Sequence, residues 1–385
     1  MSTDRAKFDA QMMGIALMMA RRGLGLTAPN PSVGALIADE GTGEVIARAV
    51  TAPGGRPHAE PQAIAQAGPR ARGKTIYVTL EPCAHFGKTP PCADVIVEGG
   101  LKRAVIAIED PDPRVAGRGL DRLRAAGIEV QRGVGAEEAR WITRGHIVRV
   151  TERRPFITLK MALDSQGRVP AGTGGSPVFV TSPQARAHGH LLRAQADAIL
   201  VGAGTMRADN PQLTCRLPGL EGRSPLRVLL SKGLDISPRA RLFDDTHAVG
   251  VLCIAGLGAG PERKAALERL GAEVALVATV GGQLWLPAVM EALVARGITR
   301  LLVEGGPGMW RAFAKQALVD EIALYVAGVD NAGGQDGFSP VTPLALVAPY
   351  AGNLPLAIAD TATLGADRLW RLRLTHKQPA HKQEG

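Results

Sequence analysis

A histidine and two cysteines, spread over the first hundred residues, constrain this chain more than any other feature of its sequence. His58 opens a His-Ala-Glu segment, and Cys83 and Cys92 follow it, each preceded by a proline. One imidazole and two thiolates would hold a zinc ion and leave its fourth tetrahedral position open for water, which is typical of a catalytic site. The carboxylate of Glu60 would move protons for that water. The pattern therefore predicts one catalytic zinc ion per chain, bound by His58, Cys83 and Cys92.

The same pattern is the signature of zinc nucleobase deaminases, in which an activated water replaces an exocyclic amine and the glutamate shuttles protons. A simpler interpretation is a buried histidine, a helical glutamate and two unrelated buried cysteines. The sequence Thr-Leu-Glu-Pro-Cys at 79–83 argues against it. A zinc-stabilised scaffold without catalysis is a further alternative, and it predicts a metal that has no exchangeable water.

Length and cysteine content limit the classes of protein to which this chain can belong. The 385 residues exceed the roughly 100 to 200 typical of one domain, so we expect two domains. Four cysteines are too few for a disulfide scaffold, which favours a reducing, cytoplasmic location. The polar segment 1–9 does not resemble a targeting signal, and no apolar run approaches the roughly 18 residues of a membrane span. We therefore expect no membrane partner.

The formal charge of +9 admits nucleic acid or phosphorylated small molecules as partners. Basic residues are scattered, and only 4% of residues are aromatic, which argues against a stacking platform for single strands. We expect a small-molecule substrate, no nucleic acid and a homo-oligomer. A deaminase acting on nucleic acid remains an alternative, and salt-dependent RNA binding would revive it.

Hydrophobic periodicity predicts an α/β fold in the first 150 residues. The expected strands are 34–38, 44–49, 75–80, 104–108 and 128–132, and the expected helices are 8–22, 59–67, 93–98, 120–126 and 137–145. His58 and Glu60 then fall at the start of one helix, and Cys92 falls at the start of another. A sheet enzyme would place metal ligands at such helix starts.

A second α/β domain is predicted to begin near Pro155, after the basic segment 149–154. Expected strands are 156–161, 198–201, 226–230, 248–254, 300–303 and 321–326, with a helix at 284–295. The expected domains are thus 1–150 and 151–375, followed by a polar tail at 376–385. Residues 301–310 read as a buried strand, a glycine-rich turn and a helix, which lets backbone amides approach a phosphate. If this segment is considered alone, an ordinary strand-to-helix turn without phosphate binding is the simpler interpretation.

Several segments of the first half resemble the deaminase half of the bifunctional RibD family of riboflavin biosynthesis. They are 27–34 (TAPNPSVG), 58–60 (HAE), 81–92 (EPCAHFGKTPPC) and 110–119 (DPDPRVAGRG). Eight residues separate the cysteines, where most deaminases of the wider superfamily have two. The resemblance implies a cytidine-deaminase-like three-layer α/β/α fold, zinc on His58, Cys83 and Cys92, Glu60 as the proton shuttle and Asn30 at the pyrimidine. We interpret His85 as a loop residue or a substrate contact, since a fourth ligand would close the site.

The second half, through 191–202, 204–216 and 301–310, resembles the reductase half of the same family. That resemblance implies a dihydrofolate-reductase-like fold that uses NADPH. The implied substrate contacts are Arg193, Leu213, Arg216 and Glu304, and the two arginines are suited to a ribose 5-phosphate. The implied NADPH contacts are Thr205, Asp209, Gly306, Pro307, Gly308, Met309 and Trp310, with Phe179 as an aromatic neighbour.

Three positions depart from the reductase pattern. Asp164 and Gln166 stand where relatives usually carry serine and aspartate, and Pro177 removes a polar side chain and an amide. The expected function is still a two-step conversion. A diaminopyrimidinone that carries a phosphoribosylamino group is deaminated, and NADPH then reduces its ribose to the ribityl chain. A monofunctional deaminase with a degenerate reductase-like domain is the alternative.

Overall fold

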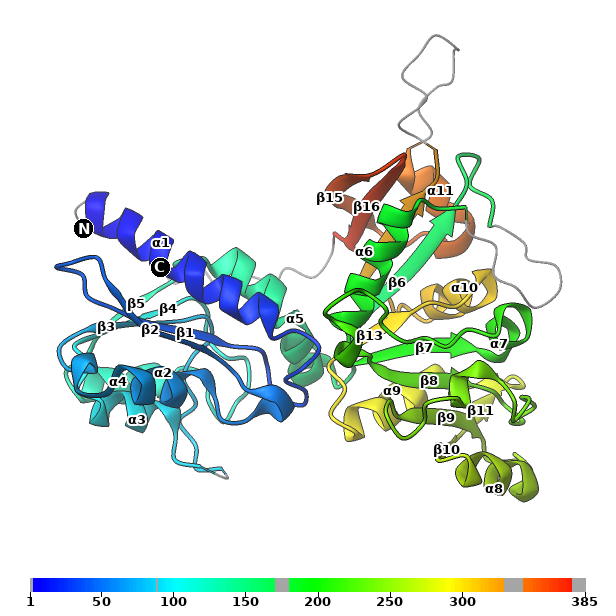
Figure 1. Ribbon diagram of the computed structural model, residues 1–385, viewed down its shortest axis with the longest axis horizontal. Coiled ribbons are helices and arrows are strands. Elements are labelled where there is room, and N and C mark those ends of the chain that lie inside the picture. The colour runs from blue at the N-terminus through cyan, green and yellow to red at the C-terminus, as the bar shows by residue number, and fades with distance from the viewer. Residues whose placement is uncertain (1–2, 88, 170–179, 329–341, 376–385) are drawn as a thin grey trace, which may run out of the picture. The chain divides into compact units, whose positions relative to one another are not determined.

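The chain forms two compact units (Figure 1), seen in a computed structural model that describes residues 3–87, 89–169, 180–328 and 342–375. Unit 1 comprises Met1–Pro155 with Val294–Thr299, and unit 2 comprises Phe156–Leu293 with Arg300–Gly385. Phe179, Pro177 and the predicted tail at 376–385 lie outside the described residues. Each unit is built around its own sheet.

In unit 1, the described strands form a sheet in the order β2-β1-β3-β4-β5. β1 runs antiparallel to β2 and β3, whereas β3, β4 and β5 are parallel. The strands are β1 (Gly34–Ala38), β2 (Val45–Val50), β3 (Thr75–Val78), β4 (Arg103–Ile106) and β5 (Glu129–Arg132). The helices are α1 (Thr3–Arg22), α2 (Ala59–Ala67), α3 (Cys92–Glu98), α4 (Arg118–Ala125) and α5 (Ala136–Glu152).

Helices cover both faces of this sheet. α1 and α5 pack together on one face, and α2, α3 and α4 follow one another across the other (Figure 1). Because β1, β3 and β4 are covered on both sides, all their residues are buried. A Cβ on Gly34 would lie 1.9 Å from the Ala16 carbonyl oxygen, so glycine lets α1 rest directly on β1. The predicted three-layer α/β/α fold is confirmed.

In unit 2, nine of the described strands form a sheet in the order β10-β9-β8-β7-β13-β6-β14-β16-β15, and β11 and β12 form a separate two-stranded antiparallel sheet. The larger sheet is parallel from β10 to β14, and the hairpin of β15 and β16 adds an antiparallel edge. The strands are β6 (Phe156–Leu163), β7 (Ala198–Gly202), β8 (Leu226–Leu230), β9 (Val251–Gly256), β10 (Glu273–Val277), β11 (Thr279–Val280), β12 (Gln283–Leu284), β13 (Arg300–Val303), β14 (Glu321–Val326), β15 (Leu356–Leu364) and β16 (Asp367–Leu374). The helices are α6 (Pro183–Ala194), α7 (Ala203–Asp209), α8 (Pro261–Arg269), α9 (Leu286–Ala295), α10 (Pro307–Lys315) and α11 (Pro343–Ala351).

The end of α5 differs from the sequence-based expectation. The helix was expected to end at Gly145, but it runs on to Glu152, so most of the basic segment 149–154 is helical. Gly145 is buried in the helix, and Pro155 follows its end. A proline excludes helical continuation and disfavours it for the residue before, so the proline and not the glycine ends the helix. Across all described residues, no helix has the length and apolar character that a membrane span requires.

Candidate functional site

Three elements of unit 1 bring the predicted zinc ligands together. His58 is the N-cap residue of α2, Cys83 lies in the loop after β3, and Cys92 is the first residue of α3. Their ligand atoms lie within 4.8 Å of one another. Among the described residues this group contains the predicted trio and not His85, whose Nδ1 is buried without a hydrogen-bond partner there.

The trio is already organised by hydrogen bonds. His58 Nδ1 lies 3.3 Å from Cys92 Sγ and 3.9 Å from Cys83 Sγ. The backbone N–H of Cys92 donates to Cys83 Sγ at 3.3 Å. A side-chain hydrogen bond between the two cysteines, with the Cys92 thiol as donor, lowers the pKa of Cys83 to about 4 and raises the pKa of Cys92. One imidazole and two cysteine sulfurs thus converge in a donor set that suits zinc.

Glu60 and Asn30 flank this group. Glu60 is 3% exposed, and burial raises the pKa of its carboxyl to about 7. Its Oε2 has no hydrogen-bond partner within the described part of the chain. Asn30 Nδ2 donates to the Gly55 carbonyl at 2.8 Å and lies 3.4 Å from His58 Nε2. A buried carboxylate oxygen left unpaired beside three metal-type ligands fits a zinc ion with a water molecule.

Unit 2 contains a cavity of about 560 Å³, within the usual size range of a ligand pocket. It lies beyond the carboxyl ends of the parallel strands β7 and β13, where α/β enzymes bind ligands. Of the predicted residues, those that line it are Arg193, Thr205, Asp209, Leu213, Arg216, Glu304, Gly306 and Trp310. Pro307, Gly308 and Met309 do not line it and form the first turn of α10.

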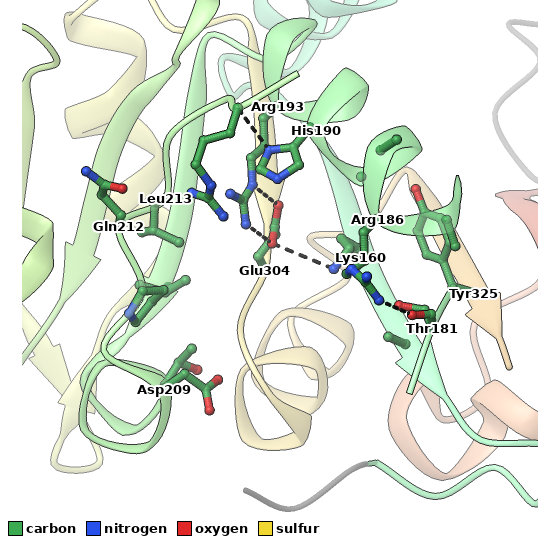
Figure 2. A pocket seen from close by; sticks show the side chains of 18 of the residues that line it. Lys160, Thr181, Arg186, His190, Arg193, Asp209, Gln212, Leu213, Glu304 and Tyr325 are labelled. Carbon is green, nitrogen blue, oxygen red and sulfur yellow. Dashed lines mark hydrogen bonds and ion pairs between the residues drawn. The ribbon is translucent and has the colours of Figure 1, made fainter. Parts of the chain in front are cut away.

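Arg193 and Glu304 form a bidentate pair in the wall of this cavity (Figure 2). Arg193 Nε donates to Glu304 Oε1 and its NH2 donates to Oε2, both at 2.8 Å. Arg193 NH1 donates to the Thr214 carbonyl at 2.9 Å, so each of its three nitrogens donates one hydrogen bond within the protein. Burial acts to raise the pKa of Glu304, but the charges of Arg193 and Lys160 lower it to about 2. Arg216, in contrast, is exposed at the cavity and contacts Thr214 Oγ1 at 3.2 Å.

Lys160 and His190 line the same cavity, and the sequence-based reasoning did not select them. Lys160 Nζ lies 3.7 Å from Glu304 Oε2 (Figure 2). The sequence feature that could have identified Lys160 is that it is the one charged residue in strand β6. His190 Nδ1 accepts a hydrogen bond from the Arg216 backbone N–H at 3.2 Å, which leaves Nε2 to carry the proton of the neutral ring. No sequence pattern pointed to His190.

Gly305, and to a lesser degree Gly202, leave room for Met309 at the start of α10. A Cβ on Gly305 would lie 2.6 Å from Met309 Cβ, and a Cβ on Gly202 would lie 2.7 Å from Met309 Cε. Among the described residues no side chain caps the start of α10, and Gly306 at that start lines the cavity, so the positive end of the helix dipole can favour an anion there. Pro307 has no N–H, and the Met309 and Trp310 N–H groups donate to the Gly306 carbonyl at 2.9 and 3.2 Å. These features fit the phosphates of a dinucleotide, and they confirm the predicted order of strand, glycine turn and helix.

The turn that departs from the reductase pattern is well ordered by hydrogen bonds. Asp164 Oδ1 accepts from the backbone N–H groups of Gln166 and Arg168, both at 2.9 Å. Tyr350 donates its hydroxyl to the Gly167 carbonyl at 2.9 Å. The aspartate therefore holds this turn together by capping its amides.

We expect unit 2 to lose stability as the pH falls from about 6.5 to about 4. Burial lowers the pKa of His188 and of His190 to about 4. The unfolded chain then takes up protons first, so the stabilising contribution is fully present above about 6.5 and is lost below it. Urea unfolding at pH 7 and pH 5, in a Trp141→Phe background so that the other tryptophans report on unit 2, measures this. His188→Asn should flatten the dependence, and an unchanged slope would contradict the assignment.

Comparisons with known proteins agree for both halves. Residues 6–108 match the family model of the cytidine and deoxycytidylate deaminase zinc-binding region, and residues 155–337 match that of the RibD C-terminal domain. The chain is 37% identical to the riboflavin biosynthesis protein RibD of Aquifex aeolicus, over 83% of this chain and 87% of that protein. It is 36% identical to RibD of Escherichia coli, with the same two coverages.

Solved structures give the same result. RibD of Acinetobacter baumannii superposes with a TM-score of 0.80 at 31% identity, over 96% of this chain and 99% of that one. A diaminohydroxyphosphoribosylaminopyrimidine deaminase/5-amino-6-(5-phosphoribosylamino)uracil reductase of Thermotoga maritima superposes with a TM-score of 0.78 at 32% identity, with the same coverages.

The two folds and their sites define a two-part enzyme, in which a zinc-dependent pyrimidine deaminase is joined to an NADPH-dependent reductase. The chain belongs to the RibD family of bifunctional riboflavin biosynthesis enzymes. The alternative of a monofunctional deaminase is not favoured, because the match covers both halves.

Proposed function

We propose that this enzyme deaminates 2,5-diamino-6-(5-phosphoribosylamino)pyrimidin-4(3H)-one to 5-amino-6-(5-phosphoribosylamino)uracil and then reduces the ribose to the ribityl chain. The main support is the convergence of the ligand atoms of His58, Cys83 and Cys92 beside the buried carboxylate of Glu60. We assign deamination to residues 1–150 and reduction to residues 151–375.

In the deaminase half, zinc would be held by His58, Cys83 and Cys92, and it would supply a water that ionises near neutral pH. Glu60 takes the proton from the attacking water and returns it to the departing amine. A carboxyl whose pKa is close to 7 can do both at neutral pH. Asn30, fixed by its hydrogen bond to the Gly55 carbonyl, orients the pyrimidine beside the histidine.

In the reductase half, NADPH supplies the hydride that reduces the open form of the ribose at C1. Thr205, Asp209 and the start of α10 at Gly306 would hold the cofactor, whose phosphates suit the uncapped helix. The substrate phosphate would bind the exposed guanidinium of Arg216, because each nitrogen of Arg193 already donates to Glu304 or to the Thr214 carbonyl. Arg193 then serves to keep Glu304 ionised and correctly oriented in the cavity.

We further propose that the enzyme is cytoplasmic and does not act on nucleic acid. Four free cysteines suit a reducing compartment, and the low aromatic content does not suit a base-stacking surface. The homo-oligomer remains a prediction, which light scattering of the purified protein can test.

The function is tested by giving the zinc-loaded protein its substrate and NADPH and following ammonia and NADPH absorbance together. We expect ammonia to appear first and NADPH to be consumed after it. Cys83→Ser should lose its zinc and its ammonia release, while it still oxidises NADPH when supplied with the deaminated compound. Full zinc content in this variant would remove Cys83 from the ligands, and no ammonia from the wild type would remove the substrate assignment.

A further inference from the structure

Glu81 is a buried carboxylate next to the zinc ligands, and no step of the proposed deamination uses it. It is 3% exposed and stands two residues before Cys83. Its side chain binds four backbone N–H groups that are 29 to 39 residues away in the sequence. Oε1 accepts from Gly119 at 2.9 Å and from Leu120 at 3.4 Å, and Oε2 accepts from Gly117 at 3.0 Å and from Asp110 at 3.2 Å. These donors form the loop after β4 and the first turn of α4.

Steric contact fixes the same turn from the side of α4. A Cβ on Gly119 would lie 2.1 Å from the Pro82 carbonyl oxygen, so the residue between Glu81 and Cys83 lies directly against the start of this helix. The backbone N–H of Glu81 also donates to the Ile108 carbonyl at 2.9 Å. The turn is therefore held by a side chain, by the backbone and by close packing.

The start of α3 holds Cys83 from the other side. The Cys83 carbonyl accepts from the Ala93 N–H at 3.2 Å, and its Sγ accepts from the Cys92 N–H at 3.3 Å. Cys92 belongs to α3 itself, so its position follows that of the helix. The position of Cys83 relative to Cys92 thus depends on how its turn is anchored, and Glu81 supplies most of the anchoring hydrogen bonds.

We infer that Glu81 is a positioning residue for the zinc site, because it fixes the Cys83 turn against the start of α4 and so sets the separation of the two zinc-binding sulfurs. This inference rests on the proposed zinc ligands. A carboxylate is suited to the task, since both oxygens only accept and its charge favours the first turn of a helix. A glutamine would have an NH2 group in place of one carboxylate oxygen. That group would face one pair of the backbone N–H donors and leave them without an acceptor.

Glu81→Gln in the full-length, zinc-loaded enzyme tests the inference. Loss of a group outside the ligand shell that orients metal ligands typically weakens metal binding about 10- to 100-fold. Glu81 acts through the backbone of the Cys83 turn, so we expect an effect of about this size, seen as zinc transfer to a chelator at a lower chelator concentration. We also expect the absorption spectrum of the cobalt(II)-substituted enzyme to change, because the cysteine geometry changes. Reduction of the deaminated compound by NADPH should remain at the wild-type rate, which shows that unit 2 is folded, and a cooperative thermal unfolding transition of unit 1 shows that the deaminase half is folded.

Asp9→Asn is the matched control for a destabilised unit 1. Asp9 is 1% exposed and pairs with Arg103 at 2.7 Å and with the Tyr77 hydroxyl at 2.8 Å, remote in sequence from the Cys83 turn. It should lower the unfolding temperature while zinc retention and the cobalt spectrum stay at wild-type values. If Asp9→Asn weakens zinc as much as Glu81→Gln does, the effect is general destabilisation and the inference is wrong.

Gly119→Ala perturbs the same turn independently, by pressing a methyl group on the Pro82 carbonyl. It decides the matter if Glu81→Gln does not fold: weakened zinc binding with an altered cobalt spectrum supports the inference, and wild-type values overturn it. Wild-type zinc binding in a folded Glu81→Gln protein also overturns it. A wild-type enzyme that holds no zinc would instead overturn the proposed ligands, so the two failures are distinguishable.

Discussion

Glu60→Gln is expected to reduce ammonia release by about 100- to 10,000-fold, the range that a positioned general acid and base contributes. Glutamine has the same shape and fits the same buried site, but it cannot take a proton from water or return one to the amine. The ligand atoms of His58, Cys83 and Cys92 are unchanged, so the variant should still bind one zinc ion. Ammonia release by a coupled assay and zinc by metal analysis measure the two outcomes together.

A matched control for the lost charge is Glu44→Gln in the same unit. The Glu44 side chain is 54% exposed and pairs only at the surface with Arg70, so ammonia release should stay at the wild-type rate. NADPH oxidation with the deaminated compound should be intact in both variants. If Glu60→Gln kept a tenth or more of the wild-type ammonia release, another group would have to move the proton.

Local sequence patterns predicted many elements of this protein closely. The bounds of β1, β8, β13 and β14 agree with the apolar runs that predicted them, because each is a short buried strand between turn residues. The convergence of the proposed zinc ligands was predictable for a related reason. Each stands in a short motif at the start of a helix or in the loop after a strand, so the chemistry is visible before the fold is known.

Contacts between distant residues were not predictable in this way. Arg193 and Glu304 are 111 residues apart, and nothing in either segment indicates that one binds the other. The four amides that Glu81 binds belong to a loop and a helix start of ordinary composition. Residue types do not show where a backbone N–H group donates, so this anchoring can be seen only in the tertiary structure.

Arg193→Met is expected to remove most of the NADPH oxidation while ammonia release continues. Taking one partner from a buried ion pair typically costs about 3 to 5 kcal/mol when the other charge is left uncompensated. Here Lys160, 3.7 Å from Glu304 Oε2, keeps part of the compensation, so we expect a cost toward the lower end of that range. Glu304 would then lose two hydrogen bonds of 2.8 Å. Burial would raise its pKa above the present value of about 2, so a larger fraction of the carboxyl would be protonated and neutral. We expect kcat for reduction to fall at least about 100-fold at neutral pH, measured with the deaminated compound as substrate.

The kinetic constants and a double variant distinguish this role from direct phosphate binding. If Arg193 positions Glu304, the loss lies in kcat, whereas Arg216→Met raises KM because the phosphate loses its exposed cation. The double variant Arg193→Met/Glu304→Gln removes both charges of the pair. Urea unfolding should therefore show higher stability than in Arg193→Met alone, while reduction stays as low. If instead Arg193→Met raised KM at unchanged kcat, and its cost simply added to that of Glu304→Gln, the arginine would contact the substrate itself. Because the pair is bidentate and the third arm of Arg193 is held by the Thr214 carbonyl, we expect the first result.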